Sequence, residues 1–159
     1  MPWAREEPLA VAGKTLQIRQ LQDDFVHGRA FTYGIFDGQE RRPLGGIGYH
    51  RTIGDAAADI GYWLDVEEVG KGFVAEAAAA LVQLGFEREG VRLLEVHCHP
   101  DNHRSAAVPQ RLGFELFTTI SGWVASPHAE PRDTQFWRLT RRAYELSPAR
   151  KAVFETMES

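Results

Sequence analysis

The sequence has little cysteine and no long apolar run. Cys98 is the one cysteine among 159 residues, which excludes an internal disulfide framework and favours a reducing, cytoplasmic compartment. No apolar stretch approaches the ~20 residues that cross a bilayer. The opening MPWAREEPLA has no apolar signal-peptide core, so neither membrane insertion nor export is expected.

An excess of positive charge is also absent. The formal net charge is -4, with 43% hydrophobic and 25% charged residues, which indicates a soluble globular protein and excludes a basic nucleic-acid binder. The length suits one core, and the chain shows no repeat and no linker, so residues 1–159 are expected to form a single domain. Any anion-binding site must therefore be local.

Two nucleotide-binding motifs are missing. The phosphate loop G-x-x-x-x-G-K-[ST] does not occur. Gly70 and Gly72 begin a G-x-G-x-x-G pattern, but Ala75 stands at its third glycine and no acidic ribose ligand follows at about twenty residues. A dinucleotide-binding domain is therefore not expected.

A metal site is not expected either, although histidines gather in one segment. The side chains that attract attention are His97, Cys98, His99, Asp101 and His103. No distant cysteine or histidine pair completes a standard zinc set, so a solvated strand end explains them better.

The apolar patterns predict alternating strands and helices. An amphipathic helix is expected at about 14–27, with Ile18, Leu21 and Phe25 at helical spacing and a polar outer face. Strands are expected at 30–36, 44–50, 59–66, 91–99, 114–120 and 134–140, the first two forming a hairpin. Residues 121–133 are expected to form a loop.

Helix start and stop signals locate three further helices. Residues 74–88 carry apolar positions three and four apart and end near Gly90. Asn102 is the expected N-cap of the next helix, which ends at Gly113. Ser147 and Pro148 indicate the cap and first turn of a short last helix.

The segment EEVGKGFVAEAAAA, residues 67–80, joins a strand to the helix at 74–88. A helix start leaves backbone N–H groups unpaired and carries partial positive charge, so glycines before it let an anion approach the main chain. Phosphate is the natural ligand. Glycines before a helix are also common in plain loops that bind nothing. These residues alone therefore leave both an anion site and a plain loop open.

Two stretches in order, DIGYWLDVEEVGKGFVAEAAAALVQLGFE and LLEVHCHPDNHRSAAVPQRLGFELF, resemble the GNAT superfamily of acyl-CoA-dependent N-acyltransferases. The likeness is greatest to the branch of ribosomal-protein N-terminal acetyltransferases and covers about residues 30–140. It implies a mixed α/β (α+β) fold, whose mostly antiparallel sheet splays at the coenzyme A site and carries helices on both faces.

The resemblance implies acetyl-CoA as cofactor and assigns its contacts. The loop before the helix binds the diphosphate through main-chain N–H groups, the strand end pairs with the pantetheine amides, and an asparagine flanks the thioester. In this chain the corresponding residues are Leu64, Asp65, Val66, Val69, Gly70, Lys71, Gly72, Phe73, Val74 and Asn102. Val69 and Val74 depart from the usual glutamine or arginine and the usual glycine or alanine, and Val74 is expected to crowd the phosphates.

The resemblance also implies two catalytic residues. Asp59 matches a position where relatives carry a glutamate general base, and its shorter side chain favours action through water. In many members a tyrosine in the second helix protonates the leaving thiolate, and Pro109 occupies its position in this chain. The resemblance to the favoured branch implies that Ser105 has this role instead. For both residues a plain solvated position remains open as an alternative.

The implied activity is transfer of an acetyl group from acetyl-CoA to a primary amine, either a protein N-terminus or a small molecule. The alternative is a non-catalytic acyl-CoA-binding or regulatory module. The family's first strand and helix have no counterpart here, so the strand at 31–36 is expected to be an exposed sheet edge that a second copy covers in a homodimer, or that a rearranged N-terminal segment covers.

Overall fold

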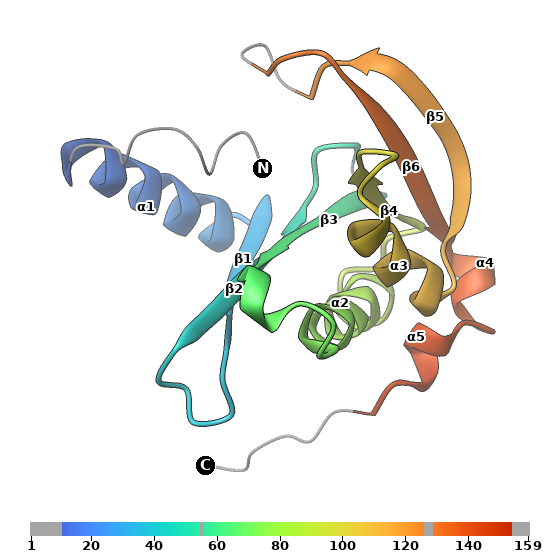
Figure 1. Ribbon diagram of the computed structural model, residues 1–159, viewed down its shortest axis with the longest axis horizontal. Coiled ribbons are helices and arrows are strands. Elements are labelled where there is room, and N and C mark those ends of the chain that lie inside the picture. Colours follow the sequence, from blue (N-terminus) through green and yellow to red (C-terminus); the bar gives the residue numbers. More distant parts are fainter. Residues whose placement is uncertain (1–10, 55, 126–128, 154–159) are drawn as a thin grey trace.

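The structure is a computed structural model that describes residues 11–54, 56–125 and 129–153 (Figure 1). Its centre is a six-stranded sheet in the order β1-β2-β3-β4-β6-β5. The strands are β1 (Ala30–Phe36), β2 (Pro43–His50), β3 (Ala57–Leu64), β4 (Leu93–Cys98), β5 (Glu115–Trp123) and β6 (Arg132–Thr140). Every neighbouring pair is antiparallel except β3 with β4. The mixed, mostly antiparallel sheet is therefore confirmed.

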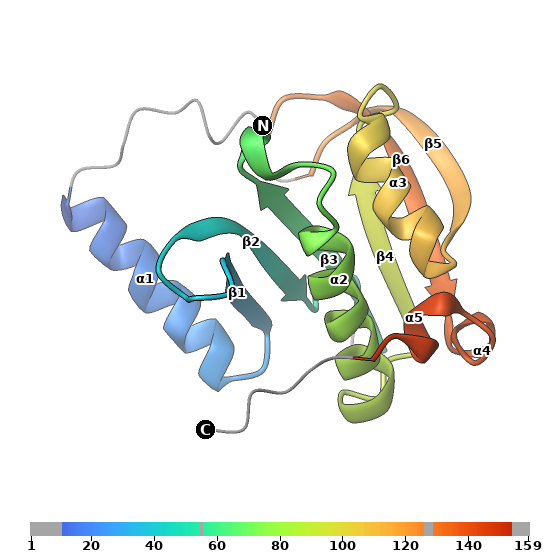
Figure 2. The same cartoon turned by 60° about the horizontal axis from the view of Figure 1, so that its bottom comes forward.

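The helices are α1 (Val11–Val26), α2 (Phe73–Gln83), α3 (His103–Leu112), α4 (Arg141–Tyr144) and α5 (Pro148–Lys151). Figure 2 shows α2 across the middle of the sheet, with α3 and α5 beside it and α1 alongside β1. We call the side of the sheet that packs on α2 the helix face. The opposite face carries His50, Asp59, Glu95, His97 and Phe136.

The core lies between the helix face and α2. Ile47, Tyr49, Ile60 and Leu94 project from three neighbouring strands and are buried there. Helix α2 meets them with Val74, Ala78, Leu81 and Val82, one stripe at helical spacing. At the end of the helix a Cβ on Gly85 would lie 3.0 Å from the Tyr49 ring, so glycine allows this close approach.

Several predicted elements are confirmed. The strand at 30–36 has the predicted bounds, and Gly113 ends α3 with a left-handed φ of 88°. Asn102 caps α3 by accepting from the Ser105 N–H, and Ser147 caps α5 by accepting from the Arg150 N–H. Each of these caps and stop signals acts on residues next to it in the sequence, which is why the sequence alone predicted them.

The predicted end of the third strand is wrong. The strand ends at Leu64 rather than at residue 66, because the Asp65 carboxylate accepts from the Glu67 N–H and starts a 3-10 turn, Val66–Glu68. The helix predicted to reach about residue 88 does reach Arg88, but its α-helical part ends at Gln83. It continues as a π-helical turn, Leu84–Arg88, in which the Glu89 N–H bonds to the Leu84 carbonyl.

The last hairpin also differs from the prediction. Part of the expected loop at 121–133 is strand, since β5 extends to Trp123 and β6 begins at Arg132. The Asp133 carboxylate joins the two strands by accepting from the Ser121 hydroxyl and the Gly122 N–H. Helix α4, which was not predicted, follows β6 directly and is capped by Thr140. Residues 126–128 of the loop lie outside the described ranges.

Helix α1 forms as predicted, but its apolar side chains are not buried. Leu16, Ile18, Leu21 and Phe25 are 41–66% exposed. Phe25 makes the aromatic contacts to β1, edge-on to Phe31 at 5.2 Å and to Tyr33 at 6.0 Å. None of the described helices has the length and apolarity needed to span a bilayer.

Candidate functional site

The parallel strands β3 and β4 stay together for only three residue pairs. They pair from Ala57 with Leu93 to Asp59 with Glu95, and no later pair continues the ladder. Beyond Asp59 the two strands separate while each continues to its own end, at Leu64 and Cys98. The sheet is therefore splayed at the point where the resemblance implies a cofactor.

A cavity of about 470 Å³ lies at this splay. It is formed by the end of β3, the loop that precedes α2, and helix α3. The lining residues are Tyr62, Trp63, Leu64, Val69, Gly70, Gly72, Phe73, Val74, Ala75, Asn102, Arg104, Ser105, Ala107, Val108 and Arg111. A cavity of this size lies within the range of small-molecule and cofactor sites.

The N-terminus of α2 opens on this cavity without a side-chain cap. Its N-cap is Gly72, in a left-handed conformation with φ 93°, and no side-chain hydrogen bond closes the first turn. Helices α3, α4 and α5 are each capped by the side chain of Asn102, Thr140 or Ser147. Because the first N–H groups of a helix have no intrahelical acceptor, those of α2 are left to bind an anion.

Gly70 and Gly72 are required by backbone conformation. Both have positive φ, 88° and 93°, and a Cβ built on either would meet nothing within 4 Å. Val74 carries the β-branched side chain that the resemblance marks as atypical. It is 9% exposed and belongs to the core cluster, so most of its side chain is directed away from solvent.

The structure brings most of the predicted cofactor residues together. Leu64, Val69, Gly70, Gly72, Phe73, Val74 and Asn102 line the cavity, while Asp65, Val66 and Lys71 do not. Asp65 caps the 3-10 turn, and Val66 is 74% exposed. The Lys71 ammonium lies 2.7 Å from the Glu68 carboxylate, which also binds Arg42.

Two basic residues of the cavity were missed. Arg104 and Arg111 lie on α3 seven residues apart, on the stripe that also contributes Val108 to the lining. The sequence signal was the helical spacing i, i+4, i+7 after Asn102, which the sequence analysis did not use. Both guanidinium groups are suited to phosphate oxygens.

Asp59 lies on the opposite face, at the last β3 residue that pairs with β4. Its carboxylate is 3.2 Å from His50 Nδ1 and also accepts from the Thr52 hydroxyl. Burial acts to raise the pKa of Asp59, but the hydrogen bonds from His50 and Thr52 outweigh it and leave the pKa below its usual value. The carboxylate is therefore ionised at neutral pH.

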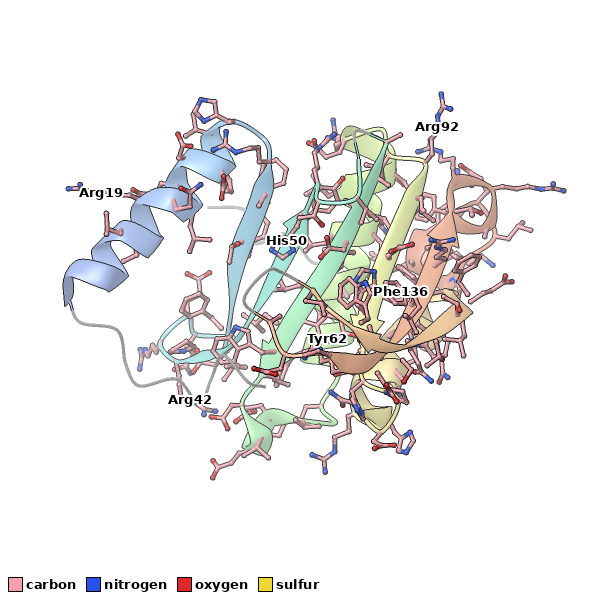
Figure 3. The ribbon with its side chains drawn as sticks, turned by 90° about the horizontal axis from the view of Figure 1, so that it is seen from above. Arg19, Arg42, His50, Tyr62, Arg92 and Phe136 are labelled. Atoms are coloured by element: carbon pink, nitrogen blue, oxygen red, sulfur yellow. The ribbon has the colours of Figure 1, made fainter. Side chains whose placement is uncertain are left out.

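A second carboxylate stands directly across from Asp59. Glu95 on β4 is buried and accepts from Arg138, and its other oxygen is 2.6 Å from His97 Nε2. The His97 ring packs against Phe136, 4.4 Å between centroids. Figure 3 views the sheet with α2 behind it, and the labelled His50 and Phe136 are seen in front.

Ser105 is in the first turn of α3 and lines the cavity. Its N–H is held by the Asn102 side chain at 3.1 Å, so the cap fixes the residue next to the splay. In residues 11–54, 56–125 and 129–153 no group of three or more His, Cys, Asp or Glu side chains is arranged to hold a metal ion.

The six-stranded, mostly antiparallel sheet with its helices has the fold of solved GNAT acetyltransferases. The family model described as "Acetyltransferase (GNAT) domain" matches residues 1–115. The chain therefore belongs to the GNAT acetyltransferase family, as its sequence motifs indicated.

Named relatives support the branch. The chain is 30% identical over 92 residues to the ribosomal-protein-serine acetyltransferase of Escherichia coli (strain K12), covering 57% of this chain and 51% of the relative. It is 26% identical over 106 residues to the [ribosomal protein uS5]-alanine N-acetyltransferase of the same organism, covering 65% of this chain and 55% of the relative. The chain thus spans little more than half the length of these relatives.

Among solved structures, Mycobacterium smegmatis RimJ in complex with CoA-disulfide superposes with a TM-score of 0.75. The match covers 89% of this chain and 68% of that one, at 23% sequence identity. At this identity the likeness shows a shared fold.

Proposed function

We propose that the protein is an acetyl-CoA-dependent N-acetyltransferase that transfers an acetyl group to a primary amine by direct attack. The observation that carries this proposal is the uncapped N-terminus of α2 opening on the cavity between the end of β3 and helix α3, beyond the point where β3 separates from β4. Membership of the GNAT family supports the same activity.

The residues around the cavity fit coenzyme A. The N–H groups from Val69 to Val74 would hold the diphosphate, and the free edge of β3 at Leu64, continued by Asp65 and Val66, would pair with the pantetheine amides. Asn102 would flank the arm. Lys71 would add positive charge to the loop while its ammonium stays paired with Glu68. When bound, acetyl-CoA supplies the acetyl group as a thioester.

Asp59 is the proposed general base. A protonated amine has no lone pair to attack with, so one proton must leave the nitrogen before the N–C bond forms. The carboxylate is ionised and held by His50 and Thr52, and because the aspartate side chain is shorter than glutamate, we propose that the proton passes through a water molecule.

Ser105 is the proposed donor to the leaving sulfur. When the C–S bond breaks, its hydroxyl in the first turn of α3 would hydrogen-bond to the thiolate. A free thiol has a pKa near ~8.5, so modest help is sufficient. The nitrogen loses a second proton as the amide forms. One of the two protons from the amine ends on the sulfur of coenzyme A, and the other is released to solvent.

The proposed acceptor is a protein N-terminus or a small-molecule amine. The two Escherichia coli relatives are named for ribosomal-protein substrates, which supports the first class. We also propose that the protein acts in the cytoplasm, since its one cysteine, Cys98, is buried and free.

A thiol-release assay tests the activity. Release of coenzyme A that depends on both acetyl-CoA and an amine, from a panel of N-terminal peptides, polyamines and amino acids, is the expected result. Binding of coenzyme A in a thermal-shift assay without release for any amine would instead identify a non-catalytic acyl-CoA-binding module.

Three variants test the assigned roles. We expect Asp59→Asn and Ser105→Ala each to lower kcat by about a hundredfold to ten-thousandfold, the range of a lost proton-transfer group. Asp24→Asn is the matched control, because Asp24 is also a hydrogen-bonded carboxylate but lies on α1. Full turnover in both site variants would refute the residue assignments while leaving the family intact.

A further inference from the structure

The carbonyl of Ser105 cannot be paired in the ordinary helical way. In an α-helix it would accept from the N–H of the fourth following residue, which is Pro109. Proline has no N–H, and Pro109 lies inside α3 with its side chain fully buried. A carbonyl shielded from water is costly to leave without a partner, and that of Ser105 is part-buried, so a donor from elsewhere stabilises it.

Tyr62 supplies that donor. Its hydroxyl donates to the Ser105 carbonyl oxygen at 2.7 Å. Burial raises the pKa of Tyr62, with the neighbouring Cys98 adding to the effect, so the phenol keeps its proton. Tyr62 and Ser105 both line the cavity, and Figure 3 shows the Tyr62 side chain near the middle of the sheet.

The bond crosses the splay. Tyr62 is three residues beyond Asp59, where β3 has already separated from β4, and Ser105 is in the helix that follows β4. The main chain of Ser105 is thus held by two side chains, its N–H by Asn102 and its carbonyl by Tyr62. The two walls of the cavity are joined at this residue.

We propose that Tyr62 is a positioning residue: its hydroxyl replaces the helix hydrogen bond that Pro109 removes, and so fixes Ser105 and the first turn of α3 against β3. The functional part rests on the proposed acetyl transfer, in which Ser105 faces the leaving sulfur. The structural part, an interdependence of residues 62 and 109, stands without it.

Tyr49 provides a matched control. It is a tyrosine of the same sheet face and is fully buried, and its hydroxyl has no hydrogen-bond partner among the described residues. Tyr49→Phe and Tyr62→Phe therefore remove the same atom from the same face of the sheet, but only the second removes a hydrogen bond.

A double-mutant cycle tests the structural part. An alanine at position 109 restores an N–H for the Ser105 carbonyl, so Pro109→Ala should rescue Tyr62→Phe. We expect Tyr62→Phe to lower the folding equilibrium constant at least about tenfold more in the wild-type background than in the Pro109→Ala background, as for a buried acceptor left unpaired. Tyr49→Phe should change it by less than about threefold in either background. Equal effects of Tyr62→Phe in both backgrounds would overturn the proposal.

Steady-state kinetics test the functional part. We expect Tyr62→Phe to lower kcat about tenfold, with KM for the amine within about threefold of wild type, because a small misplacement of a reacting group costs rate rather than binding. Pro109→Ala should recover most of that kcat. If the stability effects of Tyr62→Phe and Pro109→Ala are coupled but Tyr62→Phe leaves kcat unchanged, Tyr62 does not position Ser105 for the reaction.

The two proposals fail differently. If the wild-type protein releases no thiol with any amine, the acetyltransferase proposal falls, and the unfolding cycle alone decides the Tyr62 bond. A coenzyme A dissociation constant raised at least about threefold in Tyr62→Phe, and restored by Pro109→Ala, would then support its role in shaping the cavity. An unchanged dissociation constant would show that the Tyr62 hydrogen bond contributes to stability and not to the shape of the cavity.

Discussion

Glu95 is a buried carboxylate whose charge is balanced by two partners. Arg138 binds one oxygen, and His97 Nε2 lies 2.6 Å from the other. Burial acts to raise the pKa of Glu95, but these hydrogen bonds and the charges of His97 and Arg138 outweigh it and lower the pKa below 4.5. The folded state therefore binds its proton more weakly than the unfolded state.

A lowered carboxyl pKa stabilises the fold at higher pH. The contribution of Glu95 is fully present above its unfolded pKa, near 4.5, and is lost as the pH falls through the lower folded value. We expect the wild-type Tm to fall between pH 6 and pH 3, and Glu95→Gln to flatten that fall by about 4 °C.

Glu130→Gln is the control for this pH dependence, because Glu130 is an exposed carboxylate. Its Tm profile should follow that of the wild type. A Glu95→Gln profile as steep as the wild-type one would contradict the role of Glu95, and calorimetry at each pH measures it.

At the scale of an element, α2 combines two tasks. One stripe of its side chains fills the core, and its uncapped first turn faces the cavity. Gly72 makes the second task possible, because its left-handed φ of 93° turns the chain into the helix without a capping side chain. The cost is a helix start whose N–H groups are unsatisfied by the helix itself.

Comparing Gly72→Ala with a matched glycine variant distinguishes a loss of anion binding from a loss of stability caused by backbone strain. Alanine at a left-handed position costs about 1 kcal/mol of stability. Gly90→Ala is matched, since Gly90 also has a positive φ, 67°, with nothing near its Cβ, but lies beyond the other end of α2. We expect similar losses of Tm in both variants and weaker coenzyme A binding, by calorimetric titration, only in Gly72→Ala. Equal affinities would argue against diphosphate binding at this turn.

At the scale of the whole molecule, one edge of the sheet and its neighbouring helix are apolar and exposed. Strand β1 pairs with β2 on one side only and ends the described sheet. Beside it, α1 exposes Leu16, Ile18 and Leu21. Edge strands and apolar helix faces of this kind promote association.

We propose that a second copy covers this edge in a homodimer. Light scattering after size exclusion should then give twice the mass of one chain, and Ile18→Lys with Leu21→Lys should give the mass of one. Lys14→Glu is a control on the same helix that keeps the apolar stripe. A wild-type monomer at high concentration would refute the dimer.

Much of this architecture was predictable because its signals are local. The spacing of Val74, Ala78 and Leu81 predicted α2, and Asn102 and Gly113 marked the ends of α3. The two glycines around Lys71 left an anion site and a plain loop both open, and a cavity lies beside them. Strand β3 was predicted to end two residues too late, because the Asp65 cap competes with the sheet for the same backbone.

By itself, the sequence determined the elements, their order and the family, since propensity, caps and motifs depend on neighbouring residues. Only the tertiary structure decided which residues meet. Tyr62 and Ser105 are 43 positions apart, and Asp59 lies across from Glu95 because two parallel strands share a register. Such contacts depend on strand pairing and helix packing between distant segments, which no local pattern in the chain specifies.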